Sequence, residues 1–254
     1  MRTRQLLGAA AVLSTVLLTT TVAAQAVTGG SPDGNDHPAV GGLVADKAFS
    51  DGTWTYCSGS LLSPTVFLTA AHCGDDGAQV RVTFSSAYHD GDPVYSGTFH
   101  ANPAYGGGEN DPHDMAVVVL DRPVSGITPV QLPAAHSLSS LRQGAPITAV
   151  GYGAYQVTSG KHGGHRYLYD DVRQAGTGQM HWVTKAWLRI SENPARGDAG
   201  GCFGDSGGPN FLAGTDIEAA TTITGDAVCR STNTAYRLDT TSARDFLGQW
   251  VTLP

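Results

Sequence analysis

The stretch GCFGDSGGP, residues 201–209, places one serine, Ser206, among glycines and directly after Asp205. Glycine frees the backbone, so a hydroxyl group on such a loop can be presented to a ligand. A serine hydroxyl is a weak nucleophile at neutral pH, and it needs a base to accept its proton and a third group to orient that base. The stretch could therefore carry nucleophilic chemistry if a histidine and a carboxylate are available. The alternative is that it is only a tight turn.

The pattern Gly204-x-Ser206-x-Gly208 also fits the nucleophile elbow of α/β-hydrolases, in which the catalytic histidine follows the serine along the chain. The chain has nine histidines, and the last of them, His181, precedes Ser206. Chain order therefore excludes the elbow interpretation.

Two other stretches hold the missing groups. LTAAHCG, residues 68–74, places His72 beside a cysteine at the end of an apolar run, and DPHDMAVVVL, residues 111–120, places Asp114 at the start of another. Taken alone, His72 could equally be a hydrogen-bonded core histidine. Asp111 and His113 compete with Asp114 for a role in catalysis.

Taken together and in this order, LTAAHC, HDMAVVVL and GDSGGP resemble the chymotrypsin/trypsin family of serine peptidases. The gaps of 42 residues from His72 to Asp114 and 92 residues from Asp114 to Ser206 are similar to those of the family. So are the block YCSGSLLSPTVFLTAAHC and the stretch VGYG at 150–153. The resemblance extends from about Val27 to Val251.

The resemblance implies a role for each motif. His72 would be the general base and later the acid, Asp114 the carboxylate that orients it, and Ser206 the nucleophile that attacks the scissile carbonyl. The family places the carboxylate directly before the apolar strand, which selects Asp114. The backbone N–H groups of Gly204 and Ser206 would form the oxyanion hole. A covalent acyl-enzyme would then be released by water.

The resemblance implies an all-β fold of two six-stranded antiparallel β-barrels with a C-terminal helix and the active site between the barrels. The sequence agrees, because 33 glycines and 13 prolines favour many turns and short strands. Strands are expected within 60–71, on both sides of Ser63-Pro64, and at 79–84, 115–120, 146–152 and 219–224. A helix is expected over 242–253, capped by Thr241 or Ser242. The peptidase domain would cover 27–254, with the barrel boundary near 135–145.

Residues 1–26 differ from the rest of the chain. Arg2 and Arg4 precede the apolar run LLGAAAVLSTVLL, and Ala24-Gln25-Ala26 offers an A-x-A cleavage site. These features predict a secretory signal peptide. The alternative is a membrane anchor, but the run is shorter than the roughly 20 residues of a spanning helix. We therefore expect a secreted, extracellular protein without membrane attachment after signal removal.

Val27-Thr28-Gly29-Gly30 follows this segment directly. Members of the family become active when a new α-amino group folds inward and pairs with the aspartate before the serine. The resemblance thus implies an ion pair between the Val27 ammonium and Asp205. Because Val27 follows the expected cleavage site, we expect signal cleavage alone to create this ammonium. The alternative is that VTGG is a loop, Asp205 a turn residue, and a separate pro-segment is removed.

Four cysteines allow three disulfide pairings, and they lack the C-x-x-C spacing that would favour zinc. The resemblance pairs Cys57 with Cys73 and Cys202 with Cys229. His162 and His165 in the loop KHGGHR could also bind a metal, but an exposed glycine-rich loop explains them better. We expect no metal and no cofactor.

The resemblance also describes the specificity pocket. Members that select Arg or Lys carry an aspartate six residues before the serine, and this position is Gly200 here. Gly225 and Thr234 align with the residues that flank the pocket. The sequence therefore predicts a neutral pocket that favours uncharged side chains. Asp198 and Asp226 are close in sequence, with nothing to show where they point.

Charge and composition limit the partners. The formal net charge is −7 and no basic run is present, which argues against nucleic acid. The expected partners are polypeptide substrates and protein protease inhibitors, and the expected state is a monomer. The second hypothesis is a catalytically silent relative that acts as a binding module. Such relatives usually lack a residue of the triad, whereas this chain has all three.

Overall fold

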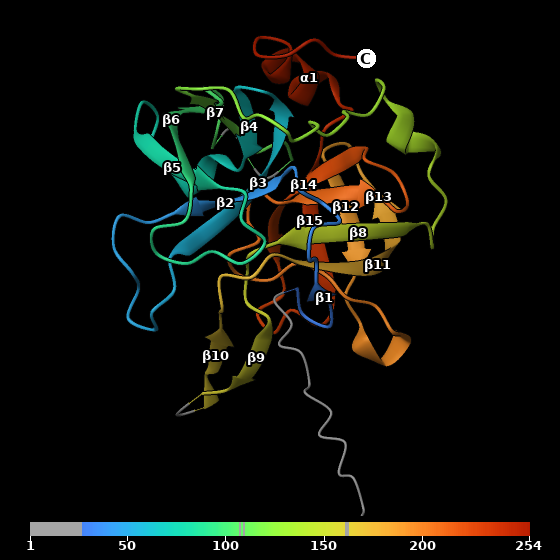
Figure 1. Cartoon of the computed structure of the whole chain (residues 1–254). Helices are drawn as coiled ribbons and strands as arrows, with labels where there is room; N and C mark the ends of the chain where they lie inside the picture. Colours follow the sequence, from blue (N-terminus) through green and yellow to red (C-terminus); the bar gives the residue numbers. More distant parts are fainter. Residues whose placement is uncertain (1–26, 107, 109, 161–162) are drawn as a thin grey trace, which may run out of the picture.

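The computed structural model describes residues 27–106, 108, 110–160 and 163–254. The expected signal peptide, residues 1–26, and His162 therefore lie outside the described residues. The chain forms two β-barrels that lie side by side, with a short helix near its C-terminus (Figure 1).

The first barrel is closed by six antiparallel strands in the order β2-β3-β4-β7-β6-β5. Their bounds are Val40–Val44 for β2, Thr55–Ser63 for β3, Val66–Thr69 for β4, Gln79–Thr83 for β5, Val94–Ala101 for β6 and Ala116–Leu120 for β7. The Ser63-Pro64 break separates β3 from β4 as expected. The strand β7 carries a nearly continuous apolar run because it lies against the core, with Val117 and Val118 fully buried.

The second barrel is closed by the strands β8-β11-β12-β15-β14-β13, because β8 pairs with both β13 and β11. The bounds are Pro146–Gly151 for β8, Gln174–Val183 for β11, Trp187–Ser191 for β12, Pro209–Leu212 for β13, Glu218–Gly225 for β14 and Thr232–Arg237 for β15. Two six-stranded antiparallel barrels and a C-terminal helix confirm the predicted fold.

Shorter elements complete the chain. The strand β1 (Ser31–Pro32) pairs with β11, and β9 (Gln156–Ser159) pairs with β10 (His165–Leu168) in a separate hairpin. Single 3-10 turns occur at Ala71–Cys73, Ser137–Ser140 and Pro194–Arg196.

The C-terminal helix α1 covers Thr241–Leu247. The prediction of its cap was wrong by one residue, because the side chain of Thr240 accepts a hydrogen bond from the N–H of Ala243. The helix also ends earlier than expected, at Leu247, although Trp250 beyond it still packs against the hydrophobic core. Across the described residues, no helix is both long and apolar enough to cross a membrane.

Arg173 joins the two barrels through a fully buried guanidinium. Its Nε donates to the Asp33 carboxylate over 2.8 Å, beside β1, and its Nη1 donates to the carbonyls of Val40 and Phe84 in the first barrel. Burial alone would raise the pKa of Asp33, but hydrogen bonds from His37 and Arg173 outweigh burial and lower the pKa. The pair is therefore charged and fixes how the barrels meet.

Replacing Arg173 should destabilise the protein strongly. Arg173→Met removes the permanent cation of the buried Asp33 carboxylate and leaves His37 as its remaining ionisable partner, and we expect the free energy of unfolding to fall by about 3–5 kcal/mol in urea denaturation. The control is Arg122→Met, because Arg122 is exposed and donates to the carbonyl of Val94. That change should cost less than about 1 kcal/mol. Equal losses for the two variants would contradict this account of the barrel junction.

Candidate active site

His72 lies in the 3-10 turn after β4, and Asp114 holds it at two points. The Oδ2 of Asp114 lies 2.8 Å from Nδ1 of the His72 ring, and Oδ1 accepts the backbone N–H of His72 over 3.0 Å. Asp114 is 5% exposed, whereas the His72 side chain is about one third exposed. The carboxylate thus fixes both the position of the turn and the ring orientation, and Nε2 has no hydrogen bond to any residue that the structure describes.

The competing residues near Asp114 have other partners. Asp111 accepts a hydrogen bond from the hydroxyl of Tyr236, and Nδ1 of His113 lies 2.8 Å from the hydroxyl of Ser242 at the start of α1. Both side chains therefore attach this loop to the C-terminal part of the chain, and Asp114 is the residue that contacts His72.

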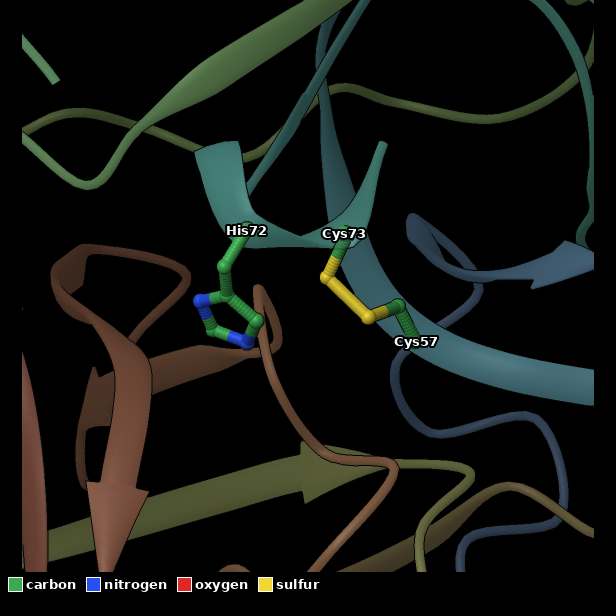
Figure 2. Close-up of side chains that lie close together, drawn as sticks. All are labelled: Cys57, His72 and Cys73. Carbon is green, nitrogen blue, oxygen red and sulfur yellow. A yellow bond between two sulfur atoms is a disulfide. The ribbon is translucent and has the colours of Figure 1, made fainter. Parts of the chain in front are cut away.

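The predicted disulfides are both present. Cys57 in β3 is bonded to Cys73, and Cys202 is bonded to Cys229. The first lies directly beside His72 (Figure 2). The sulfurs of Cys57 and Cys73 and a ring nitrogen of His72 cluster as metal ligands would, but the sulfurs are already bonded to each other. This cluster is therefore a structural support for the turn that carries His72.

Ser206 lies on a loop that the first barrel holds in place. Ser58 of β3 donates its N–H to the carbonyl of Ser206 over 2.8 Å and its hydroxyl to the carbonyl of Gly204 over 3.0 Å. The same hydroxyl accepts the N–H of Tyr152. The serine loop belongs to the second barrel, so Ser58 fixes it relative to the turn of His72.

Gly204 has a φ of +95°, a conformation that L side chains rarely adopt. The carbonyl groups of Gly204 and Ser206 both accept hydrogen bonds from Ser58. The N–H groups of the same two residues have no backbone acceptor among the described residues. Two unused backbone donors on one tight turn are what an oxyanion hole requires.

A cavity of about 370 Å³ opens between the barrels and brings these residues together. His72 lines it from the first barrel, and the serine loop, including Gly204 and Ser206, lines it from the second. The far wall is the end of β14 and the loop after it, from Thr222 to Asp226.

Asp205 points away from this cavity into the protein. Its carboxylate accepts the N–H of Gly153 over 2.8 Å and that of Cys202 over 2.8 Å. Burial raises the pKa of Asp205 to about 7, although these two hydrogen bonds lower it. No cation is bonded to this carboxylate within the part of the chain that the structure describes.

The segment of Val27 is packed against β11 of the second barrel. Val27 is 0% exposed, and its side chain fills the space beside Gly176. Thr28 pairs with Gly200 in an isolated β-bridge and accepts its N–H over 3.3 Å. The segment is thus packed against the strand that leads to Cys202 and the serine loop.

The structure separates the three residues assigned to the specificity pocket. Gly225 lines the cavity, whereas Gly200 and Thr234 are not among its lining residues. Thr234 is buried and its hydroxyl accepts a hydrogen bond from Arg189. Its neighbour Asn233 lies closer to the cavity wall, since its amide faces Gly201.

Sequence reasoning missed one residue of this region, Glu192. It follows β12, its side chain is 1% exposed, and its carboxyl lies against Gly200. No motif of the sequence marks it. The one available signal is its type, because a glutamate at the end of a buried strand needs a partner.

The fold and the site define a two-barrel β protein in which a histidine–aspartate pair and a glycine-flanked serine share one cavity. The family model described as Trypsin matches residues 27–246, so the chain belongs to the trypsin family.

The individual relatives share only about a quarter of their residues with this chain. Glucanase inhibitor protein 2 of Phytophthora sojae is 27% identical over 74% of this chain, and the chymotrypsin of Phaedon cochleariae is 26% identical over 72%. The chain spans about two thirds of the length of these relatives, 65% and 68% respectively. The structure of HL collagenase at 1.7 Å shares the fold with a TM-score of 0.61 and 20% identity, over 91% of this chain and 97% of that one.

Gly153 should tolerate no side chain. A Cβ atom there would lie 2.5 Å from Oδ2 of Asp205. We expect Gly153→Ala to displace the carboxylate, to lower the free energy of unfolding by about 3 kcal/mol in urea, and to slow labelling of Ser206 by a serine-directed probe. The control is Gly126→Ala, where φ is +79° but no atom lies within 4 Å. It should cost about 1 kcal/mol and leave labelling unchanged. Normal labelling of Gly153→Ala would contradict the role of Asp205.

Proposed function

We propose that this chain is a secreted serine endopeptidase that hydrolyses peptide bonds through an acyl-enzyme. The observation that carries the proposal is the Asp114–His72 hydrogen bond at the edge of the cavity that Ser206 also lines. Asp114 accepts Nδ1–H and leaves Nε2 of His72 as the base. Ser206 loses its proton to Nε2 as its Oγ attacks the scissile carbonyl, and the same proton then passes to the leaving amine.

The oxyanion hole of this proposal is the pair of free N–H groups at Gly204 and Ser206. As the carbonyl carbon becomes tetrahedral, its oxygen gains negative charge, and fixed donors stabilise that charge without reorganising. Water then attacks the acyl-enzyme with His72 again acting as the base. Polypeptides are the substrates, and protein protease inhibitors are the expected partners of the same cleft.

Ser206 should react with an organophosphate probe, and this reaction tests the proposal. We expect wild type to be labelled and Ser206→Ala to remain unlabelled. Asp114→Asn should slow labelling by roughly 10³–10⁴-fold, because the histidine tautomer is then wrong for proton acceptance. Mass spectrometry of the labelled peptide identifies the site. Absence of labelling in folded wild type across pH 6–9 would overturn the proposal.

The second candidate, a binding module without catalysis, is favoured by one observation. A relative is named as a glucanase inhibitor protein, so a member of this fold group is described by what it inhibits. The intact His72–Asp114 pair and the unused N–H groups of the serine loop favour catalysis in this chain. The probe experiment separates the candidates, because a binding module leaves the probe unreacted.

We further propose that removal of residues 1–26 creates the active form. Val27 is already buried against β11 of the second barrel, and the Asp205 carboxylate lacks a cation among its described partners. A free ammonium at Val27 would supply that charge and fix the serine loop. The two disulfides are consistent with an exported protein, since such bonds persist in oxidising compartments. The domain would then cover 27–254, with its barrels divided near 135–145.

The pH dependence of stability should reveal this ion pair. When Val27 is held in a peptide bond, the pKa of Asp205 is about 7 in the folded chain, above its ordinary 3.8. The folded state then binds the extra proton, so the free energy of unfolding falls by about 4 kcal/mol as pH rises from about 4 to 7. A free Val27 ammonium lowers this pKa and removes most of the loss.

The measurement compares two forms in the Ser206→Ala background, one starting at Val27 and one starting at Ala26. Urea denaturation at pH 5 and pH 7 should show the larger loss for the Ala26 form. Other buried acids titrate alike in both forms, so the difference isolates Asp205. Identical pH profiles, or N-terminal sequencing of the secreted protein that finds a start other than Val27, would contradict the proposed activation.

A further inference from the structure

The carboxyl group of Glu192 is buried without a partner. Glu192 is 1% exposed, and neither Oε1 nor Oε2 has a hydrogen bond to any residue that the structure describes. Buried carboxyl groups are costly unless they are paired, so such a group points to a function that supplies the partner.

The position of this carboxyl is defined by Gly200. A Cβ atom built on Gly200 would lie 2.6 Å from Oε1 of Glu192 and 2.5 Å from its Cγ. The glutamate therefore fills the space that a side chain at residue 200 would take. Gly200 is followed by Gly201 and Cys202, which line the cavity between the barrels.

A second unpartnered acceptor lies on the neighbouring strand. Asn233 of β15 is directly opposite Ile190 of β12, so it faces the same side as Glu192, two residues further on. The N–H of Glu192 continues this ladder by donating to the carbonyl of Ser231 over 3.1 Å. The amide nitrogen of Asn233 faces Gly201, while its Oδ1 has no partner among the described residues.

When Glu192 is ionised, the unpartnered atoms of these two residues are all acceptors: both oxygens of Glu192 and Oδ1 of Asn233. A ligand that satisfies them must bring donors, and the carboxyl favours a positive charge. Lysine and arginine side chains carry three and five N–H donors and no acceptor. They match this set, whereas an apolar side chain would leave every one of these acceptors unsatisfied.

The two other acids close to the serine loop, Asp198 and Asp226, already have hydrogen-bond partners. Asp198 accepts hydrogen bonds from Gln179 and from Ser191. Asp226 lines the cavity, but its carboxylate accepts backbone N–H groups of its own loop, including those of Ser231 and Thr232. Glu192 is thus the acid in this region whose carboxyl oxygens have no hydrogen-bond partner among the described residues.

The charges around Glu192 are negative. Burial raises the pKa of Glu192 to about 9, and the carboxylates of Asp226 and Asp205 raise it further in the same direction. An incoming cation would reverse this balance, because an opposite charge at contact distance favours the ionised carboxylate.

We propose that Glu192 is the specificity-determining residue of this site and that it selects lysine or arginine on the carbonyl side of the scissile bond. The substrate side chain enters between the serine loop and the end of β14, passes Gly201 and Gly225, and ends at Glu192. The inference rests on the proposed peptidase function. It replaces the neutral pocket expected from Gly200, because the acid comes from the end of β12 instead.

The test uses peptide substrates that differ only at this residue: arginine, lysine, glutamine and leucine. Wild type should cleave the basic peptides with the highest kcat/KM. Glu192→Gln should lower kcat/KM for arginine and lysine by about 30- to 1000-fold, because the buried cation loses its counter-charge. Cleavage of the glutamine and leucine peptides should change by less than about threefold, and active-site titration with the serine probe should be unchanged.

Two further variants separate charge from packing. Asp226→Asn keeps the side-chain volume of the acid that lines the cavity, and we expect the preference for arginine over leucine to persist, because Glu192 remains and the loss of a neighbouring negative charge favours its ionised form. The double variant Glu192→Ala/Gly200→Asp moves the acid to the neighbouring residue within the same space. It should recover much of the arginine preference that Glu192→Ala alone loses.

The ratio of kcat/KM for arginine over leucine should also rise with pH. Below its pKa most of the free enzyme carries neutral Glu192, so the ratio should increase between pH 7 and 9 by up to about tenfold per unit. It should be flat in Glu192→Gln. The negative charges of Asp226 and Asp205 raise the pKa of Glu192 and so shift the pH at which the ratio rises, whereas the rise itself requires the Glu192 carboxyl.

Each other outcome overturns the inference in a distinct way. Preference for leucine or glutamine in wild type, with no effect of Glu192→Gln, means that the pocket is neutral. An equal loss of kcat/KM for all four peptides in Glu192→Gln means that Glu192 supports the fold or pairs with the Val27 ammonium.

If wild type cleaves no peptide and does not react with the serine-directed probe, the proposed peptidase function is wrong. Titration calorimetry of acetyl-arginine amide with Ser206→Ala and Ser206→Ala/Glu192→Gln then still decides, because equal binding by both contradicts the role of Glu192.

Discussion

The buried carboxylate of Asp205 is the constraint on which the site depends. It accepts one N–H from Cys202, before the serine turn, and one from Gly153, after β8. These two bonds fix the turn whose next residues present the unused N–H groups. A carboxylate in a dry interior is stable as an anion only if a cation joins it, which is why burial raises its pKa to about 7. The geometry of the serine loop is thus coupled to the source of that positive charge.

The same constraint explains why neither barrel could hold the site alone. Asp205 and the serine loop belong to the second barrel, but Ser58 of the first barrel bonds the carbonyls of Gly204 and Ser206. His72 and its carboxylate partner come entirely from the first barrel. Small errors in how the barrels meet would therefore separate the base from the serine, and the buried Arg173 guanidinium opposes such errors by bonding residues of both.

Local patterns predicted those parts of the structure in which neighbouring residues decide the outcome. The apolar run at 115–120 predicted β7, and the family resemblance that the motifs carry implied both disulfides and the residues that share the cavity. Strands such as β11 and β15 were missed because Thr, Gly and Arg interrupt their apolar pattern, and tertiary pairing overrides that weak propensity. The helix cap was misplaced by one residue, since Thr240, Thr241 and Ser242 are all good caps.

Glu192 could not have been predicted in this way. Which atom fills the space beside Gly200 depends on where β12 ends relative to the serine loop, and no spacing in the sequence encodes that distance. A glycine at the expected acidic position indicates a neutral pocket only if no other strand reaches the same point. Here the longer side chain of Glu192 reaches the space beside Gly200 from the end of β12. The carboxyl group therefore lies near residue 200, although the acidic residue itself stands elsewhere in the sequence.

Asp205 and Glu192 also influence each other. Both are buried acids without a cation among the described residues, and the negative charge of Asp205 contributes to the raised pKa of Glu192. On the proposed activation, the Val27 ammonium cancels the charge of Asp205 and so reduces the free-energy cost of ionising Glu192. Removal of the N-terminal segment would then order the oxyanion hole and strengthen the attraction for a basic side chain in one step. The first of these charges is neutralised permanently by the chain itself, and the second only while substrate is bound.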